Sequence, residues 1–183
     1  MKLSLGQTAP EFSTTDVYGK QISLKDFQGR KLLLAFQRNA ACPFCSYQLF
    51  RLNKIYPQLQ EKGLEVLVFF ESQAEAILKS SFLTDQKLTI ISDPKRKIYT
   101  QYGAEITADK IEKVFAIPSR MEDLQASQAL KLASTEKEDG VNQAALPAAF
   151  LLDEKAIIRH IHYGQDLGDN IPLDAVSAFA NQK

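Results

Sequence analysis

The chain has little cysteine, no tryptophan and no surplus of either charge. Among its 183 residues are two cysteines, and 22 lysines and arginines balance 22 aspartates and glutamates. A secreted domain held by disulfides would need more cysteines in a shorter chain. The neutral balance lacks both the basic footprint of a nucleic-acid-binding protein and the polybasic face that binds anionic membranes. We therefore expect neither nucleic acid nor a membrane as a partner.

Long hydrophobic runs and cofactor motifs are also missing. The longest apolar stretches, residues 32–36 and 66–70, are far too short to cross a bilayer. The first residues lack the apolar core of a secretory signal, so we expect a cytoplasmic protein. Glycine-rich phosphate loops and flavin or nicotinamide signatures are absent. We expect no cofactor and no metal, with electrons supplied by another protein or a small thiol.

The chain is long enough for one domain with a substantial core, since 45% of its residues are hydrophobic. Short apolar runs at 31–36, 64–70 and 89–92 predict buried strands. Helical patterns separate them, the second running from a predicted capping box, Ser72 to Glu75, through about Phe82. This alternation predicts an α/β fold with a central mixed sheet flanked by helices.

The first helix is predicted from apolar residues that recur at steps of four and three. These residues are Cys45, Leu49, Leu52, Tyr56 and Leu59. Pro57 lies inside the pattern and is expected to kink or restart the helix. Lys62-Gly63 is expected to end it.

The two ends of the chain follow other patterns. Residues 12–15 and 21–23 predict an N-terminal β-hairpin, and 148–152 with 157–162 predict a second antiparallel hairpin. Residues 173–180 have helical spacing. Residues 104–145 fit the strand–helix alternation least well, and we expect a partly helical insertion there. Its helical stretches are predicted around 110–114 and 121–132, before a polar segment at 134–143.

The two cysteines form the motif Cys42-Pro43-Phe44-Cys45, between a predicted strand and the start of a helix. A thiolate is favoured by the unsatisfied N–H groups and the positive dipole end of a helix N-terminus. We therefore predict that Cys42 is acidic and exposed, and attacks a substrate disulfide. Cys45, one turn further and more buried, would then resolve the mixed disulfide. Pro43 suits the first helical position.

Several neighbouring residues have two interpretations. Arg38 either lowers the pKa of the Cys42 thiol or is a solvated loop arginine. Phe44 is expected to be an exposed contact for a partner, or else to pack on the adjacent loop. Glu71 is more simply a solvated acid at a strand end than a proton acceptor. His160 and His162 are expected to be half-buried strand residues, because their spacing does not suit a zinc site with the cysteines.

With these residues in place, the chain resembles the thioredoxin-fold superfamily. More narrowly, it resembles the peroxiredoxin-like branch of the alkyl hydroperoxide reductase and thiol-specific antioxidant family. The similar segments are Gly6 to Phe12, Gly19-Lys20, Ile22 to Phe27 with Gly29, Phe36-Gln37-Arg38 leading to Cys42 through Cys45, Ser92-Asp93-Pro94, Tyr102-Gly103, and Leu146 to Asp153.

The resemblance implies a thioredoxin-like fold and further site residues. It implies that Pro147 is a cis-proline facing the cysteines, and that Leu146 presents its backbone to a substrate chain. The ordinary trans proline is also compatible with the sequence. Gly164 is expected to line the same groove by allowing close backbone approach. Together with Pro43 and Phe44, these residues are the predicted substrate-binding set.

Two departures separate the chain from typical peroxiredoxins of that family. Counted from Phe36, Cys45 occupies the peroxidatic position and Cys42 the position of a threonine. Counted back from Phe150, Pro147 stands where an arginine is usual. The missing threonine and arginine leave hydroperoxide reduction in doubt, unless Arg38 supplies the charge.

We therefore expect a thiol–disulfide oxidoreductase in antioxidant or redox homeostasis. Its substrate would be a protein disulfide, a small thiol or a hydroperoxide, and its reductant a thioredoxin or glutathione system, with a homodimer as one assembly. One alternative is a peroxiredoxin-like hydroperoxide reductase that attacks with Cys45 or Cys42. A second is a non-catalytic thioredoxin-fold module that senses redox state or binds a partner.

Overall fold

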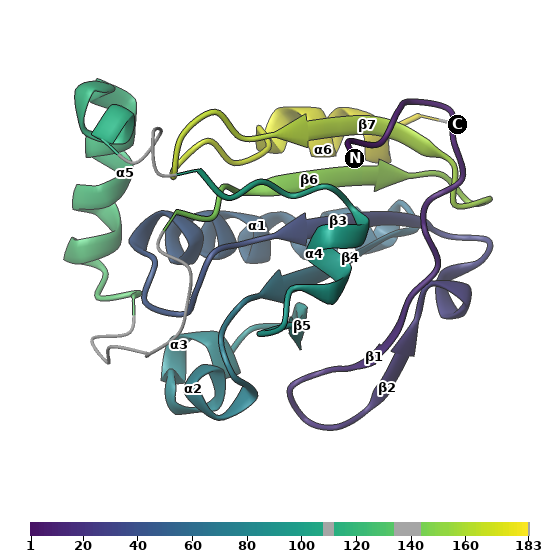
Figure 1. The fold of residues 1–183 in the computed structure, drawn as a ribbon, viewed down its shortest axis with the longest axis horizontal. Coiled ribbons are helices and arrows are strands. Elements are labelled where there is room, and N and C mark those ends of the chain that lie inside the picture. The colour runs from purple at the N-terminus through teal and green to yellow at the C-terminus, as the bar shows by residue number, and fades with distance from the viewer. Residues whose placement is uncertain (108–111, 134–143, 183) are drawn as a thin grey trace.

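A five-stranded mixed sheet forms the centre of the computed structural model, which describes residues 1–107, 112–133 and 144–182 (Figure 1). Its strands follow the order β5-β4-β3-β6-β7. They are β3 (Lys31–Phe36), β4 (Leu64–Phe70), β5 (Thr89–Ser92), β6 (Ala148–Leu152) and β7 (Ile158–Tyr163). β3, β4 and β5 are parallel, whereas β6 and β7 run antiparallel to their neighbours. The predicted mixed sheet is confirmed.

Every residue of β3 is buried because the strand contributes to two cores. Alternate side chains of a strand point to opposite faces of its sheet. Leu33 and Ala35 therefore enter one apolar cluster, whereas Leu32, Leu34 and Phe36 enter the other. This explains why the sequence of β3 is a continuous apolar run rather than an alternation.

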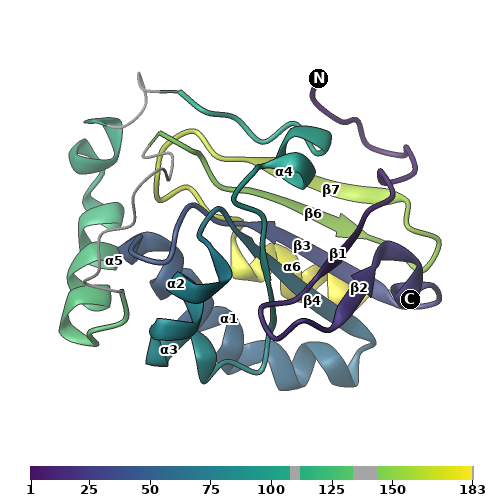
Figure 2. The same ribbon diagram turned by 60° about the horizontal axis from the view of Figure 1, so that its bottom comes forward.

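Helices cover one face of the sheet, and a short helix with the N-terminal segment covers the other (Figures 1 and 2). α1 (Pro43–Glu61) and α6 (Leu173–Ala180) pack into the first cluster. α4 (Lys97–Gln101) packs into the second. The C-terminal helix has the predicted bounds, and the chain turns at Gly63 after α1 as expected.

Both predicted hairpins are present. β1 (Ser13–Thr15) and β2 (Gln21–Ser23) form a small antiparallel sheet of their own. β6 and β7 pair at the edge of the central sheet, with an irregularity in register at Leu151/Leu152.

Two details of the helices differ from the predictions. α1 continues through Pro57, which is exposed, so the carbonyl that loses its N–H partner can be hydrated. The second helix is split into α2 (Ala74–Lys79) and α3 (Ser81–Thr84). The predicted capping box is wrong, because the Ser72 hydroxyl accepts the Ala40 N–H instead of capping α2. Ser72 thus holds the loop that leads to the cysteines.

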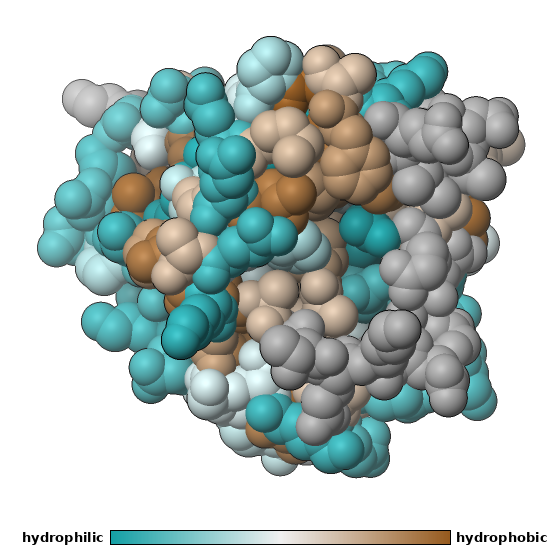
Figure 3. Space-filling view, turned by 90° about the vertical axis from the view of Figure 1, so that its left-hand side faces the viewer, coloured by the Kyte–Doolittle hydropathy of each residue, from teal (hydrophilic) through white to brown (hydrophobic). Residues whose placement is uncertain are grey.

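The inserted region is partly helical, as predicted, with different bounds. A 3₁₀ helix spans Glu112–Ala116 and α5 spans Pro118–Ala129. Residues 110–111 and the polar segment 134–143 lie outside the described residues. Figure 3 views the molecule from the side of α5 and shows apolar surface among polar side chains. Phe115 and Leu130, which flank α5 in the chain, are 58% and 48% exposed.

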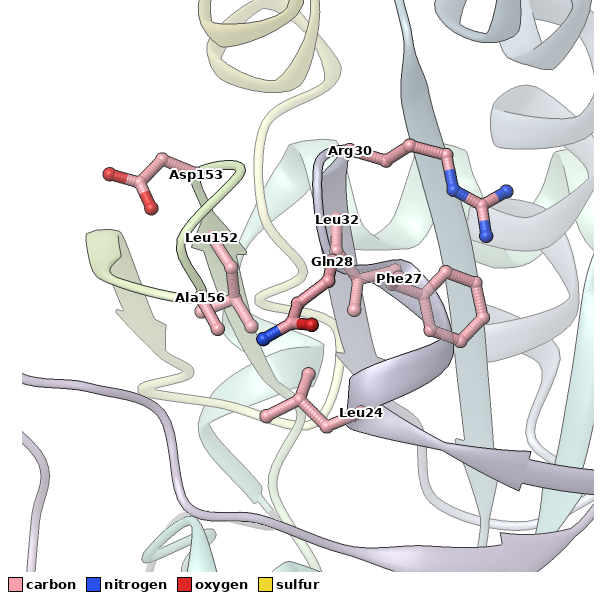
Figure 4. A pocket seen from close by; sticks show the side chains of 8 residues that line it. All are labelled: Leu24, Phe27, Gln28, Arg30, Leu32, Leu152, Asp153 and Ala156. Atoms are coloured by element: carbon pink, nitrogen blue, oxygen red, sulfur yellow. The ribbon is translucent and has the colours of Figure 1, made fainter.

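A small pocket lies at the end of the sheet away from the cysteines. It opens beside the first residues of β3 and the last residues of β6, whereas the cysteines follow the last residue of β3. Figure 4 shows the side chains of Leu24, Leu152 and Ala156 around the Gln28 amide. Neither cysteine lines this pocket, so it is not part of the candidate site.

Candidate active site

The local fold places the cysteines as the sequence predicts. β3 ends at Phe36, a five-residue loop follows, and Cys42 is the N-cap of α1 with Pro43 at its first helical position. The Cys42 N–H donates to the Asn39 carbonyl (3.0 Å), which closes the loop. Both cysteines are free thiols in this structure. The two sulfurs therefore lie within the first turn of one helix.

Three N–H groups converge on the two sulfur atoms. The Cys45 N–H donates to Cys42 Sγ (3.3 Å), as the helix N-terminus predicts. Arg38 Nη1 donates to the same sulfur (3.5 Å). The backbone N–H of Arg38 donates to Cys45 Sγ (3.4 Å). Arg38 is 7% exposed and contacts both cysteines, so it is not the solvated loop arginine of the alternative interpretation.

These contacts separate the two thiols in acidity. Burial acts to raise the pKa of Cys42, but hydrogen bonds from Cys45 and the charge of Arg38 outweigh it and lower the pKa to about 6. Burial raises the pKa of Cys45 well above its usual value, and the hydrogen bond to Cys42 and that residue's charge add to the effect. Near neutral pH, Cys42 is therefore the thiolate and Cys45 the thiol.

The prediction that Cys42 is exposed is wrong. Cys42 is 2% exposed and Cys45 is fully buried. Cys42 belongs to an apolar cluster that also contains Phe44, Leu146 and Leu167. The thiolate is thus stabilised by fixed donors inside the protein rather than by water.

Phe44 is also buried, at 5% exposure, so its expected exposure is wrong, whereas its role as a partner contact stays a prediction. The alternative, packing on an adjacent loop, is confirmed. Gly168 lies against the Phe44 ring so closely that a Cβ there would come within 3.0 Å of Phe44 Cδ1. Arg120 Cδ would lie even closer to that Cβ (2.8 Å), so a residue larger than glycine at 168 would displace the Arg120 side chain and the Phe44 ring.

The predicted cis-proline is not found. The peptide bond before Pro147 is trans, since no described peptide bond is cis. A trans bond is the lower-energy form of X–Pro by roughly 0.5–1 kcal/mol. The Leu146 N–H donates to the Glu105 carbonyl (3.0 Å), so this half of the Leu146 backbone pairs with the inserted region.

Gly164 permits a close backbone approach, as predicted, but within the chain itself. Its N–H donates to the Pro147 carbonyl (2.8 Å). A Cβ at this position would come within 2.8 Å of the carbonyl oxygens of both Pro147 and Asp169. The substrate-binding roles of Pro43, Phe44, Leu146, Pro147 and Gly164 stay predictions.

The interpretation of Glu71 as a solvated acid is wrong. Its side chain is 3% exposed and forms an ion pair with Arg96 at the start of α4. Its N–H donates to the Arg38 carbonyl (2.9 Å). The Asp93 carboxylate stabilises the first turn of α4 by accepting hydrogen bonds from the N–H groups of Lys97, Ile98 and Tyr99. An aspartate between a strand and a helix is typical of capping, whereas nothing in the sequence singles out Arg96 or Tyr99.

His160 and His162 are half-buried strand residues, as predicted. His162 Nε2 lies 2.8 Å from the Asp169 carbonyl oxygen and 3.4 Å from the Asp169 carboxylate. Arg120 of α5 pairs with both Asp166 and Asp169. This group joins α5 to residues 165–170, the segment that also packs on Phe44.

The His162–Asp169 pair predicts a pH-dependent stability. Burial opposes charge on His162, but Asp169 raises its pKa above the usual 6.5, so its contribution is full below 6.5 and lost as pH rises through the folded pKa. The pKa of Asp169 is lowered despite burial, by hydrogen bonds from His162 and the Gln165 N–H, so its contribution holds above about 3.8. Chemical unfolding of His162→Gln should show a loss of roughly 1 kcal/mol at pH 5.5 and much less at pH 9.

His160→Gln is the matched control for this measurement. Burial and the nearby His162 lower the pKa of His160, so its removal should not destabilise the protein preferentially at acidic pH. An equal loss for His162→Gln at pH 5.5 and pH 9 would exclude the charged pair.

Residues 1–107, 112–133 and 144–182 contain no cluster of three or more His, Cys, Asp or Glu side chains able to hold a metal ion. Within the same ranges, no helix combines the length and apolar character needed to cross a bilayer.

Comparison with known proteins identifies similar chains. The AhpC/TSA family model matches residues 5–161. The thiol-disulfide oxidoreductase ResA of Bacillus thuringiensis is 32% identical over 103 residues, 56% of this chain and 59% of ResA. Peroxiredoxin Bcp of Escherichia coli is 31% identical over 101 residues, 55% of this chain and 65% of Bcp. The matches thus span less than two thirds of each relative.

Solved structures show the same fold at low identity. A mutant of peroxiredoxin 6 from Arenicola marina superposes with a TM-score of 0.72 at 12% identity, covering 98% of this chain and 72% of that one. The reduced 2-Cys peroxiredoxin of Plasmodium vivax gives a TM-score of 0.69 at 17% identity, with 98% and 81% covered. These superpositions confirm the predicted thioredoxin-like fold.

Proposed function

The chain belongs to the AhpC/TSA family, and we propose that it acts there as a single-domain thiol–disulfide oxidoreductase through Cys42 and Cys45. One observation carries the proposal. Three N–H groups, two of them from Arg38, are directed at the two sulfurs; the donors to Cys42 help to make that thiol acidic, whereas burial keeps Cys45 protonated. This is the division of roles that disulfide exchange requires.

The reaction then has two exchange steps. The Cys42 thiolate attacks one sulfur of a substrate disulfide, forms a mixed disulfide and releases the other substrate sulfur as a thiolate. Cys45 loses its proton and attacks Cys42 Sγ, which releases the second substrate thiolate and leaves a Cys42–Cys45 disulfide. Two electrons pass from the cysteine pair to the substrate. A thioredoxin-type or glutathione-type reductant would restore the two thiols.

Arg38 would serve both steps. Its guanidinium contacts the Cys42 sulfur, so it favours the attacking thiolate. Its backbone N–H contacts the Cys45 sulfur, so it favours the second thiolate when that forms. Because burial excludes water from both sulfurs, these fixed donors carry the stabilisation that solvent would otherwise supply.

Hydroperoxide reduction is the second candidate, and the relative named peroxiredoxin Bcp favours it. In that reaction a thiolate attacks one peroxide oxygen, the O–O bond breaks, and the other oxygen leaves as an alcohol or water. The resulting sulfenic acid reacts with the thiol of the other cysteine to form a disulfide, with loss of water. Cys45 holds the peroxidatic position of the sequence frame, yet it is fully buried and its pKa is raised. The lowered pKa of Cys42 also weighs against a non-catalytic module.

Competing substrates distinguish the two activities. The reduced protein is mixed with glutathione disulfide, with an insulin-type protein disulfide or with hydrogen peroxide, and the loss of free thiols is followed. We expect at least one disulfide to oxidise the pair faster than equimolar peroxide. Cys42→Ser should abolish reaction with both kinds of oxidant. If Cys42→Ser still consumed peroxide at the wild-type rate, Cys45 would be the peroxidatic cysteine and the proposal would be wrong.

The setting of the protein is part of the same proposal. The proposed compartment is a reducing cytoplasm, because the two cysteines of this sequence form one redox pair and are free thiols rather than a structural disulfide. A homodimer could use the end of the molecule at α5, where Phe115 and Leu130 are exposed.

A further inference from the structure

The buried hydroxyl of Tyr99 contacts the Gln37–Arg38 peptide, whose N–H donates to Cys45. Tyr99 of α4 is fully buried, and its Oη lies 2.5 Å from the Gln37 carbonyl oxygen and 2.8 Å from the Phe69 carbonyl oxygen. The phenol has one proton to donate. Because the Phe69 carbonyl already accepts the Gln37 N–H (2.8 Å), the Gln37 carbonyl gains most from that proton.

The Gln37 carbonyl and the Arg38 N–H belong to the same peptide unit. A peptide is planar and trans, so its C=O and N–H point in opposite directions. In this unit the carbonyl points at the Tyr99 hydroxyl, and the N–H points at Cys45 Sγ (3.4 Å). Fixing the carbonyl therefore fixes the direction of the N–H. A hydrogen bond at the carbonyl also polarises the peptide and strengthens the N–H as a donor.

We propose that Tyr99 is a positioning residue for Cys45, which it reaches through the Gln37–Arg38 peptide. The inference rests on the proposed function, because it concerns the cysteine that resolves the mixed disulfide. Tyr99 is itself held in place. The Arg96 guanidinium lies over its ring at 4.7 Å and pairs with Glu71. The N–H of Glu71 in turn donates to the carbonyl of Arg38.

The hydroxyl stays a donor throughout the working pH range. Burial raises the pKa of Tyr99 well above its usual value, so the phenol remains protonated. Tyr99 acts on Cys45, whereas the Arg38 side chain acts on Cys42. Cys42 takes its hydrogen bonds from the Arg38 side chain and the Cys45 N–H, so losing the Tyr99 hydroxyl should affect Cys45 and leave the attack by Cys42 almost unchanged.

Tyr99→Phe tests this with the aromatic disulfide DTNB as the probe. Attack by Cys42 releases one thionitrobenzoate at a rate that depends on probe concentration. Resolution by Cys45 releases a second at a rate that does not. In Tyr99→Phe the first step should be unchanged. The second should slow about fivefold, the effect of losing one ordinary hydrogen bond, and its pH midpoint should move upward.

Tyr102→Phe is the matched control. Tyr102 is equally buried in the same cluster, and its hydroxyl donates to the Pro10 carbonyl (2.8 Å), away from the cysteines. It should lose similar stability, measured by thermal unfolding, with both DTNB steps unchanged. If Tyr99→Phe gave the same two rates and the same pH midpoint as Tyr102→Phe, the inference would be overturned and the proposed function would stand. If the wild type released only one thionitrobenzoate, the proposed function itself would fail.

If Tyr99→Phe proved too unstable to assay, the Arg38 amide resonance of Cys42→Ser, with Tyr99 intact, would serve as the second measurement. An N–H held on a sulfur should shift in the NMR spectrum as Cys45 ionises at alkaline pH in the Cys42→Ser variant. An Arg38 amide that does not respond to that ionisation would overturn the inference.

Discussion

Cys42→Ser should react with a disulfide at least about 100-fold more slowly than the wild type at pH 7. The reason is the supply of thiolate. With its pKa lowered to about 6, Cys42 of the wild type is mostly thiolate at that pH. In the variant, the hydrogen bond and charge of Cys42 are gone, but burial still raises the pKa of Cys45 and keeps this thiol mostly protonated. Cys45 is also fully buried, which adds an access barrier. Stopped-flow measurement of DTNB reduction gives the two rates directly.

Cys45→Ser is the partner variant and should behave oppositely. Cys42 keeps its contact with Arg38, so the first attack should proceed, and the mixed disulfide should persist because no resolving thiol is present. Mass spectrometry of the intact protein should show one stable adduct on Cys42. If Cys42→Ser attacked the disulfide as fast as Cys45→Ser does, the assignment of the two roles would be contradicted.

Arg38→Met should raise the pKa of Cys42 by roughly 1–2 units, because a cation near a buried anion commonly shifts its pKa by that amount. The guanidinium lies 3.5 Å from the sulfur, and its charge is among the causes that lower this pKa. At pH 6 the thiolate fraction should fall from about half to a few per cent. The pH dependence of the first DTNB step measures the shift.

Two further variants test whether the charge itself is responsible. Arg38→Lys keeps the charge but loses the planar fork, so the pKa should lie between those of the wild type and Arg38→Met. Arg159→Met removes an exposed arginine of β7 that pairs with Asp153. This change should leave the pKa of Cys42 unchanged. If Arg38→Met kept a midpoint near pH 6, the hydrogen bonds from Cys45 would be sufficient alone and Arg38 would have no catalytic part.

Local patterns were enough to predict most of the fold. The continuous apolar run of β3 indicated a strand buried on both faces, and two clusters do meet there. The position of Cys42 before Pro43 predicted the start of α1, because a cap and a proline at the first helical position are local features. The low pKa of Cys42 was predictable for the same reason, because the groups that lower it, Cys45 and Arg38, are three and four residues away in the sequence.

The failures at Cys42 and Glu71 depend on segments distant in sequence. The sequence predicts an exposed Cys42, but this residue is buried in an apolar cluster that includes Leu146 and Leu167, more than 100 positions along the chain. Glu71 was taken for a solvated acid, because its partner Arg96 lies on α4 and no local pattern joins them.

The central claim is that Cys42 is the acidic, attacking thiol and Cys45 the resolving one. The most direct test is alkylation of the reduced wild-type protein with iodoacetamide across pH 4 to 10, with the modified cysteine identified by peptide mass spectrometry. The account predicts labelling of Cys42 with a midpoint near pH 6, while Cys45 stays unmodified until much higher pH. Labelling that begins at Cys45, or a Cys42 midpoint near the free-thiol value of about 8.5, would contradict it.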